Sequence, residues 1–153
     1  MLVINKFISR LEKISPIRLG IIFLFLEIIN SYIFAFLFPD VKGSDFENIY
    51  EELFVVVLFA PLIETYLIQH LVIKNVLKYS NNNLLLALLL SAIVFGLAHT
   101  YSIIYVVKTF ISGLIFGILY LTMRKNSEKA ILYVAVTHAV FNLFAITINH
   151  LFI

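Results

Sequence analysis

The sequence contains no cysteine and few charged residues. Without cysteine the chain can form no disulfide, no thiolate nucleophile and no Cys-ligated zinc site. Only 13% of its 153 residues are charged, whereas about 25% is usual in soluble domains. The formal net charge of +2 is too small to indicate nucleic acid as a partner. The chain therefore cannot form the polar shell that a soluble domain of this size needs.

Apolar residues are abundant instead, at 62% of the chain, with 15 Phe and 8 Tyr. They form runs of about 20 residues, the length of helix that crosses the hydrocarbon core of a bilayer. The alternation typical of a transmembrane β-barrel is absent. The composition predicts an all-α membrane protein with about five transmembrane helices in one bundle, with the lipid bilayer around it.

The predicted transmembrane spans are residues 17–38, 53–73, 84–98, 103–123 and 130–149. Residues 1–16 are predicted to form an amphipathic helix at the membrane interface, and residues 17–153 one helical membrane domain. Basic residues cluster in the N-terminal segment, after the second span and after the fourth. Because basic loops favour the cytoplasmic side, we expect a multi-pass protein of the cytoplasmic membrane with its N-terminus inside.

The connections between the spans are polar. Residues 39–52 are predicted to form a loop, which includes Lys42, Gly43 and Asp45, and residues 80–83 a turn rich in asparagine.

Glu64 lies in the middle of the second predicted span. An ionised side chain at that depth costs about 2.5 kcal/mol or more, so such residues usually have a partner and a function. His138 and Asn142 are four residues apart in the fifth span and so share a helix face. His99 lies at the end of the third span. Counted from the predicted span ends, Glu64 and His138 lie at similar depths. A straight, upright third span would place His99 nearer the opposite membrane face, whereas a tilt or a deeper start of that span would bring it level.

These four side chains could hydrolyse a peptide bond. A carboxylate with an imidazole beside it can deprotonate water, and a second imidazole and a carboxamide can donate hydrogen bonds to the developing oxyanion. Alternatively, Glu64, His99 and His138 could bind a divalent metal such as zinc, although the His-Glu-x-x-His signature is absent. The spacing alone leaves three functions open: a hydrolase, a binding protein, and a transporter or scaffold whose Glu64 and histidines carry protons.

Two other features of the spans predict packing rather than chemistry. Glu27, in the first span, is expected to hydrogen-bond to a neighbouring helix. Gly113 and Gly117 form a Gly-x-x-x-Gly pattern, which is typical of helices that approach closely. His70 and His150 have no sequence context that predicts a role.

Three motifs in order resemble the CPBP (Abi) family of intramembrane proteases, which includes CAAX proteases and bacteriocin-processing enzymes. They read Pro-Leu-Ile-Glu64, Phe95-Gly-Leu-Ala-His99 and His138-Ala-Val-Phe-Asn142. The resemblance covers about residues 55–148 and implies an intramembrane endopeptidase that acts on a membrane-associated peptide or a lipidated protein. It also implies that Glu64 and His99 activate water and that His138 and Asn142 stabilise the oxyanion. This is the glutamate-type mechanism, which requires no metal cofactor.

The first motif departs from the family pattern, in which a second glutamate follows the first and an arginine lies four positions later. Here these positions hold Thr65 and Gln69. Breaking a buried ion pair costs roughly 3–5 kcal/mol, whereas replacing both partners can be nearly neutral. We therefore expect Thr65 and Gln69 to support the motif as an uncharged substitute for a structural ion pair. If the second glutamate is needed for catalysis, the alternative is an inactive membrane binding protein, such as a bacteriocin self-immunity factor.

Overall fold

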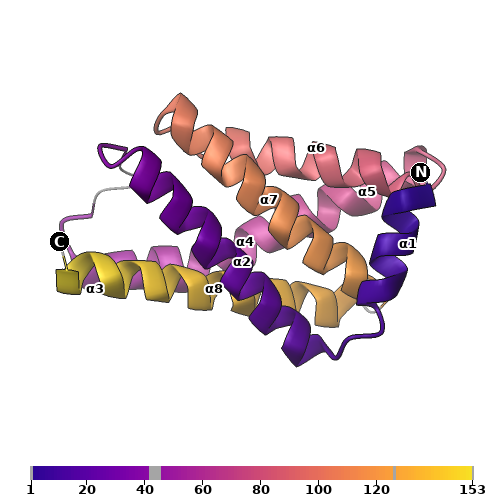
Figure 1. The fold of residues 1–153 in the computed structure, drawn as a ribbon, viewed down its shortest axis with the longest axis horizontal. Helices are drawn as coiled ribbons and strands as arrows, with labels where there is room; N and C mark the ends of the chain where they lie inside the picture. Colours follow the sequence, from indigo (N-terminus) through magenta and orange to yellow (C-terminus); the bar gives the residue numbers. More distant parts are fainter. Residues whose placement is uncertain (1, 42–45, 126, 153) are drawn as a thin grey trace.

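The computed structural model describes residues 2–41, 46–125 and 127–152, and they form a bundle of helices with no strand among them (Figure 1). The elements are α1 (Leu2–Leu11), α2 (Pro16–Leu37), α3 (Ile49–Glu52), η1 (Leu53–Phe59), α4 (Ala60–Glu64), η2 (Thr65–Val72), α5 (Ile73–Tyr79), α6 (Leu84–Leu97), α7 (Ile103–Met123) and α8 (Ser127–Phe152), where η marks a π-helical segment. The predicted all-α fold is confirmed. Lys42, Gly43 and Asp45 of the predicted loop lie outside the described residues.

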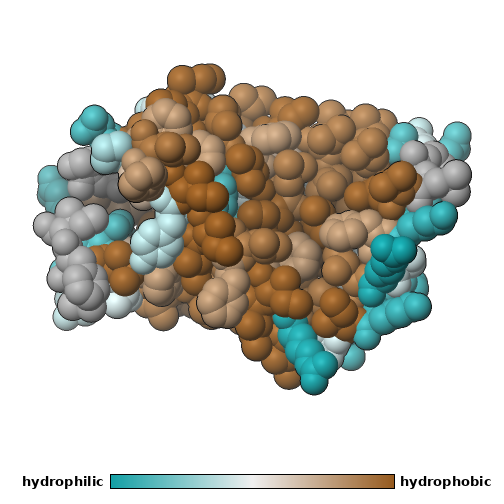
Figure 2. Space-filling model, in the orientation of Figure 1, coloured by the Kyte–Doolittle hydropathy of each residue, from teal (hydrophilic) through white to brown (hydrophobic). Residues whose placement is uncertain are grey.

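Within the described residues, four helical stretches are long and apolar enough to cross a membrane: Pro16–Leu37, Ile49–Tyr79, Ile103–Met123 and Glu128–His150. Large apolar side chains such as Phe25 and Phe36 stay exposed on their outer faces. On the face shown in Figure 2, this apolar surface forms a broad brown band between hydrophilic ends. Exposed apolar surface of this extent has lipid as its natural solvent. The chain is a multi-pass integral membrane protein.

The third predicted span is shorter than the other four. Helix α6 begins at Leu84, as predicted, where the side chain of Asn83 accepts a hydrogen bond from the Leu86 N–H. It ends after 14 residues, a length of about 21 Å at 1.5 Å per residue, against about 30 Å of hydrocarbon core. The predicted turn before α6 is confirmed, since Asn81 and Asn82 have positive φ angles of 52° and 59°, a conformation that asparagine tolerates.

The second span is longer than the predicted range 53–73. It is continuous from Ile49 to Tyr79, 31 residues in all, so the last part of the predicted loop is helical. The helix starts early because the Asn48 side chain accepts a hydrogen bond from the Tyr50 N–H. It ends late because Lys74 ends the apolar run without ending the helix, and long basic side chains can reach the interface from a helical position.

An irregular hydrogen-bond pattern in the second span leaves one main-chain carbonyl without a main-chain donor, two turns before Glu64. In the π-helical segment η1, the Ala60 N–H donates to the carbonyl of Val55, five residues back. The same register would pair the Val56 carbonyl with the N–H of Pro61, but proline has none. The side-chain amide of Asn142 on α8 donates to this carbonyl instead, at 2.7 Å. One polar side chain therefore ties the fifth predicted span to the irregular part of the second.

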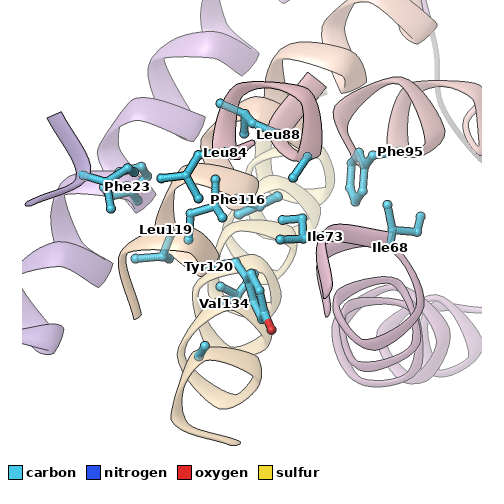
Figure 3. Close-up of a cluster of buried hydrophobic side chains, with 14 of the residues drawn as sticks. Phe23, Ile68, Ile73, Leu84, Leu88, Phe95, Phe116, Leu119, Tyr120 and Val134 are labelled. Carbon is cyan, nitrogen blue, oxygen red and sulfur yellow. The ribbon is translucent and has the colours of Figure 1, made fainter. Parts of the chain in front are cut away.

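Helices α6 and α7 form the closest pair in the bundle. A Cβ added at Gly113 would lie 2.9 Å from both Ala92 Cα and Phe95 Cβ, so only glycine fits at this crossing. The packing role predicted for the Gly-x-x-x-Gly pattern is confirmed at Gly113. The buried cluster around this crossing includes Leu88, Phe95 and Phe116 (Figure 3).

Helix α1 has the predicted amphipathic character. Ile8 is buried against the core cluster and Ile4 packs beside it, while Lys6 and Arg10 are exposed. Just beyond the helix, Glu12 accepts a hydrogen bond from Lys125 at the far end of α7, at 2.7 Å, which ties the N-terminal segment to the bundle. The interfacial position of α1 stays a prediction.

Candidate active site

A cavity of about 280 Å³ lies inside the bundle. It is lined by Glu27, Phe46, Val55, Val56, Ala60, Glu64, Phe95, His99, Tyr101, Tyr105, Lys108, Thr109, Ser112, Phe116, His138, Phe141 and Asn142. All four side chains predicted to carry the chemistry are in this lining. The polar site was predicted between the second, third and fifth spans, and α2 and α7 contribute to it as well.

Both histidines approach the carboxylate of Glu64, one at each oxygen. His99 Nε2 lies 3.7 Å from Glu64 Oε1, and His138 Nδ1 lies 3.9 Å from Glu64 Oε2. The depth of His99 relative to Glu64, which the sequence left open, is level, and the count along the sequence differed because the predicted second span ended too early. The helix of the second span continues to Tyr79. The number of residues from Glu64 to this end equals the number of residues from the start of α6 to His99.

The hydrogen bonds of His99 fix its tautomer. Its Nδ1 lies 2.8 Å from the main-chain oxygen of Phe95. Because a carbonyl oxygen only accepts hydrogen bonds, Nδ1 carries the proton and Nε2 of the neutral ring presents a lone pair. Nε2 is the ring atom that faces Glu64. His99 is therefore oriented as a hydrogen-bond acceptor toward the carboxylate, and two acceptors cannot bond to each other directly.

His138 is held by aromatic rings rather than by hydrogen bonds. Its ring stacks on Phe116 with centroids 4.6 Å apart, and Phe95 lies at 5.8 Å. Its side chain is only 7% exposed, and its Nδ1 is buried without a hydrogen-bond partner among the described residues. A polar nitrogen in this setting strongly favours a partner that enters the cavity.

Asn142 lies one helical turn from His138 and lines the same cavity. Its amide nitrogen carries two N–H groups. One N–H binds the Val56 carbonyl at 2.7 Å, which leaves the second N–H for another acceptor. The bond to Val56 also restrains the amide, so that Asn142 is positioned before any substrate arrives.

Thr65 and Gln69 are buried behind the site. Both are fully inaccessible to solvent, and neither is in the cavity lining. The hydroxyl of Thr65 and both polar atoms of the Gln69 amide have no hydrogen-bond partner within residues 2–41, 46–125 and 127–152. Their role as a substitute for an ion pair stays a prediction.

The cavity lining contains polar residues that the sequence analysis did not connect with the site. Glu27 hydrogen-bonds to α7, as predicted, because Ser112 Oγ donates to its Oε1. It nevertheless lines the cavity, together with Lys108 and Tyr105 of α7. Lys108 was detectable from the sequence, because a lone cation within an apolar span is itself a sign of function.

Other histidines lie outside the cavity. His70 binds the hydroxyl of Tyr120 through Nδ1 at 2.7 Å, and His150 Nε2 lies 2.9 Å from Glu52 Oε2. Glu64, His99 and His138 are the residues that would hold a metal ion. In the described part of the chain, no group of three or more His, Asp or Glu side chains is arranged to coordinate one.

Comparison with known families identifies the class of protein. The model of the family described as Type II CAAX prenyl endopeptidase Rce1-like matches residues 47–144. The chain belongs to this family. The match spans Glu64, His99, His138 and Asn142 and confirms the resemblance to CAAX-type intramembrane proteases over nearly the predicted range. The searches of curated proteins and of solved structures gave no match.

Proposed function

We propose that this CAAX endopeptidase family member is an active intramembrane endopeptidase, in which Glu64 and His99 activate water for attack on a peptide bond. The observation that carries the proposal is the convergence of two imidazoles on the Glu64 carboxylate in a buried cavity. Such a cluster inside an apolar bundle is costly, and a catalytic role accounts for its presence.

The distance between Glu64 and His99 supports a water between them. At 3.7 Å the two groups are too far apart for a direct hydrogen bond, and separations above 3.5 Å are typical of contacts bridged by water. Since the carboxylate and the His99 Nε2 lone pair are both acceptors, a water can donate one O–H to each. Its own lone pair then points away from both groups, toward a carbonyl carbon in the cavity.

The reaction follows from this placement. The water oxygen bonds to the carbonyl carbon of the substrate while Glu64 takes one of its protons. The resulting tetrahedral intermediate carries an oxyanion. As the C–N bond breaks, Glu64 returns the proton to the leaving nitrogen, and the products are a carboxylic acid and an amine. Glu64 begins and ends the cycle as a carboxylate.

His138 and Asn142 stabilise the oxyanion in this scheme. The second amide N–H of Asn142 and a ring N–H of His138 are the donors, and both side chains lie in the cavity wall. Donors fixed before the reaction are effective because they need no reorganisation when charge develops. The Val56 carbonyl fixes Asn142, and the stacked Phe116 ring fixes His138.

We propose a prenylated or otherwise membrane-associated peptide or protein as the substrate, in keeping with the family description. An apolar lipid group would stay in the bilayer while the adjoining peptide enters the cavity. The mechanism needs no metal ion.

We also propose that the N-terminus lies in the cytoplasm. Basic residues cluster in the N-terminal segment and after the second and fourth predicted spans, and basic segments favour the cytoplasmic side. Because the chain has no cysteine, single cysteines at Ser9 and at Asp40, which is exposed in the loop after the first span, can report the two sides by labelling of intact cells.

Cleavage of farnesylated CAAX peptides by the purified protein in detergent tests the proposed activity. We expect Glu64→Gln and His138→Ala to lower kcat by about 10²–10⁴-fold, the usual contribution of a general base or an oxyanion donor. The chain offers matched controls on the same two helical spans. Glu52 and His150 pair outside the cavity, so Glu52→Gln and His150→Ala should cleave at the wild-type rate.

Two outcomes would contradict the proposal. Cleavage that persists in Glu64→Gln would show that this carboxylate is not the base. A wild-type protein that binds the peptide but does not cleave it would point to the binding-protein alternative.

A further inference from the structure

A second polar group shares the cavity with the proposed catalytic residues. Glu27 on α2 is 1% exposed, and its Oε1 accepts a hydrogen bond from Ser112 Oγ. Its Oε2 is buried and has no partner within the described residues. An unpaired buried carboxylate oxygen is costly and strongly favours a donor that enters the cavity.

Lys108, one turn before Ser112 on α7, provides a donor in the same wall. Its ammonium lies over the ring of Tyr105, 5.1 Å from the centroid. Among residues 2–41, 46–125 and 127–152, no carboxylate comes within ion-pair distance of it. The cavity therefore presents one unused acceptor, Glu27 Oε2, and one unused donor, Lys108 Nζ, beside the catalytic group.

The proposed reaction determines the conformation of a substrate in the cavity. A carbonyl inside an α-helix already accepts a hydrogen bond from the N–H four residues later along the chain. The carbonyl under attack must be open to the water and to the oxyanion donors, so the segment around the scissile bond is extended. An extended segment leaves its N–H and C=O groups without internal partners, and in a membrane the protein must supply those partners.

We propose that Glu27 and Lys108 bind the main chain of the extended substrate beside the scissile bond. Glu27 Oε2 accepts a hydrogen bond from a substrate N–H, and Lys108 Nζ donates one to a substrate carbonyl. Because one acidic and one basic side chain together carry no net charge, this subsite selects an uncharged amide over a charged side chain or terminus. The inference rests on the proposed function for the position of the scissile bond. It explains how one site can accept different residues next to that bond.

Binding measurements on the full-length protein in detergent test the subsite without requiring turnover. The probe is a short fluorescent peptide ending in farnesyl-Cys-Val-Val-Met, measured by fluorescence anisotropy in a Glu64→Gln background. Each amide near the cysteine is replaced in turn by an ester, which removes one N–H and keeps the shape of the chain. We expect one ester position to weaken binding by about 10- to 100-fold, the range for a hydrogen bond to a charged group.

Variants of Glu27 and Lys108 then assign the contact. The ester penalty is the loss of affinity when one amide of the peptide is replaced by an ester. Adding Glu27→Gln should weaken binding of the all-amide peptide and remove most of this penalty at the sensitive amide. Lys108→Met should weaken binding of every peptide, and Lys108→Arg should restore it. Thr122 is the matched control, because it is a buried polar residue of α7, the helix of Lys108, that hydrogen-bonds within its own helix and does not line the cavity. Thr122→Ala should keep both the affinity and the ester penalty.

Three results would overturn the subsite: no ester substitution that weakens binding, an ester penalty of the same size in the Glu27 protein and in Glu27→Gln, or an equal loss of the penalty in Thr122→Ala. The failure of the proposed function looks different. The ester penalty can depend on Glu27 even if the wild-type protein cleaves no peptide. This result would support the subsite and contradict only the proteolytic activity.

Discussion

Replacing Gly113 by alanine should separate two helices that hold the proposed active site together. The added methyl group would lie 2.9 Å from Ala92 Cα and from Phe95 Cβ, whereas carbon atoms pack at about 3.5–4.0 Å. Because neither neighbour is the end of a flexible side chain, α6 and α7 must move apart by roughly 0.6–1 Å. Phe95 moves with α6, and its carbonyl orients His99.

The effect on activity should exceed the effect on stability. Overpacking costs about 1–3 kcal/mol, and the better helix propensity of alanine returns about 1 kcal/mol. The net loss of folding free energy is therefore roughly 0–2 kcal/mol. Displacing a catalytic group by about 1 Å can lower the rate by about 10²-fold. We expect kcat for a farnesylated peptide to fall by that order, with a small decrease in melting temperature in detergent.

Gly117, one turn along the same helix, is the control. A methyl group there would meet only Leu88 Cδ1, at 2.7 Å, and the end of a leucine side chain can rotate away. Gly117→Ala should keep wild-type activity and be at least as stable as the wild type. Equal activity of Gly113→Ala and Gly117→Ala would refute the argument that the α6–α7 distance sets the position of His99.

Three further predictions concern the support of the site. Asn142→Leu leaves the Val56 carbonyl without its donor and should lower the free energy of unfolding by about 1–3 kcal/mol. We expect a lower melting temperature in addition to a loss of kcat. An unchanged melting temperature would contradict the structural role of the bond to Val56. Thr65→Glu alone buries an unpaired charge and should destabilise the protein by roughly 3–5 kcal/mol. Adding Gln69→Arg should restore stability, and a double-mutant cycle without coupling would sink the ion-pair interpretation. Exhaustive chelation should leave cleavage unchanged, and loss of activity that zinc restores would replace the proposed mechanism with a metal-dependent one.

Much of the fold could be read from the sequence, because helices in a bilayer depend on local properties. Long apolar runs must form helices where water is absent, since only a helix satisfies its own main-chain groups. The start of α6 and the whole of α7 were predicted correctly for this reason. The second span was predicted too short at both ends, because hydropathy marks only the apolar part of a helix. The helix extends beyond that part to the cap at Asn48 and past Lys74.

The catalytic candidates could also be identified from the sequence, because polar side chains in apolar spans are expensive. Glu64 and His138 were recognised on that ground, and the structure places both in one cavity. The same reasoning would also select Glu27 and Lys108, but the sequence does not say which way each helix faces. Only the crossing of α2 and α7 brings these two residues into the cavity lining.

The amino-acid sequence by itself determined the membrane environment, most of the helices and the polar residues whose burial is costly. The tertiary structure decided which of those residues meet. It brings His99 to Glu64 because the second span extends to Tyr79, and it assigns Asn142 a structural bond because Pro61 leaves the Val56 carbonyl without an N–H. Spacing along one helix fixes only which side chains share a face. The distances between helices depend on long-range packing, here on glycines that let α6 and α7 touch.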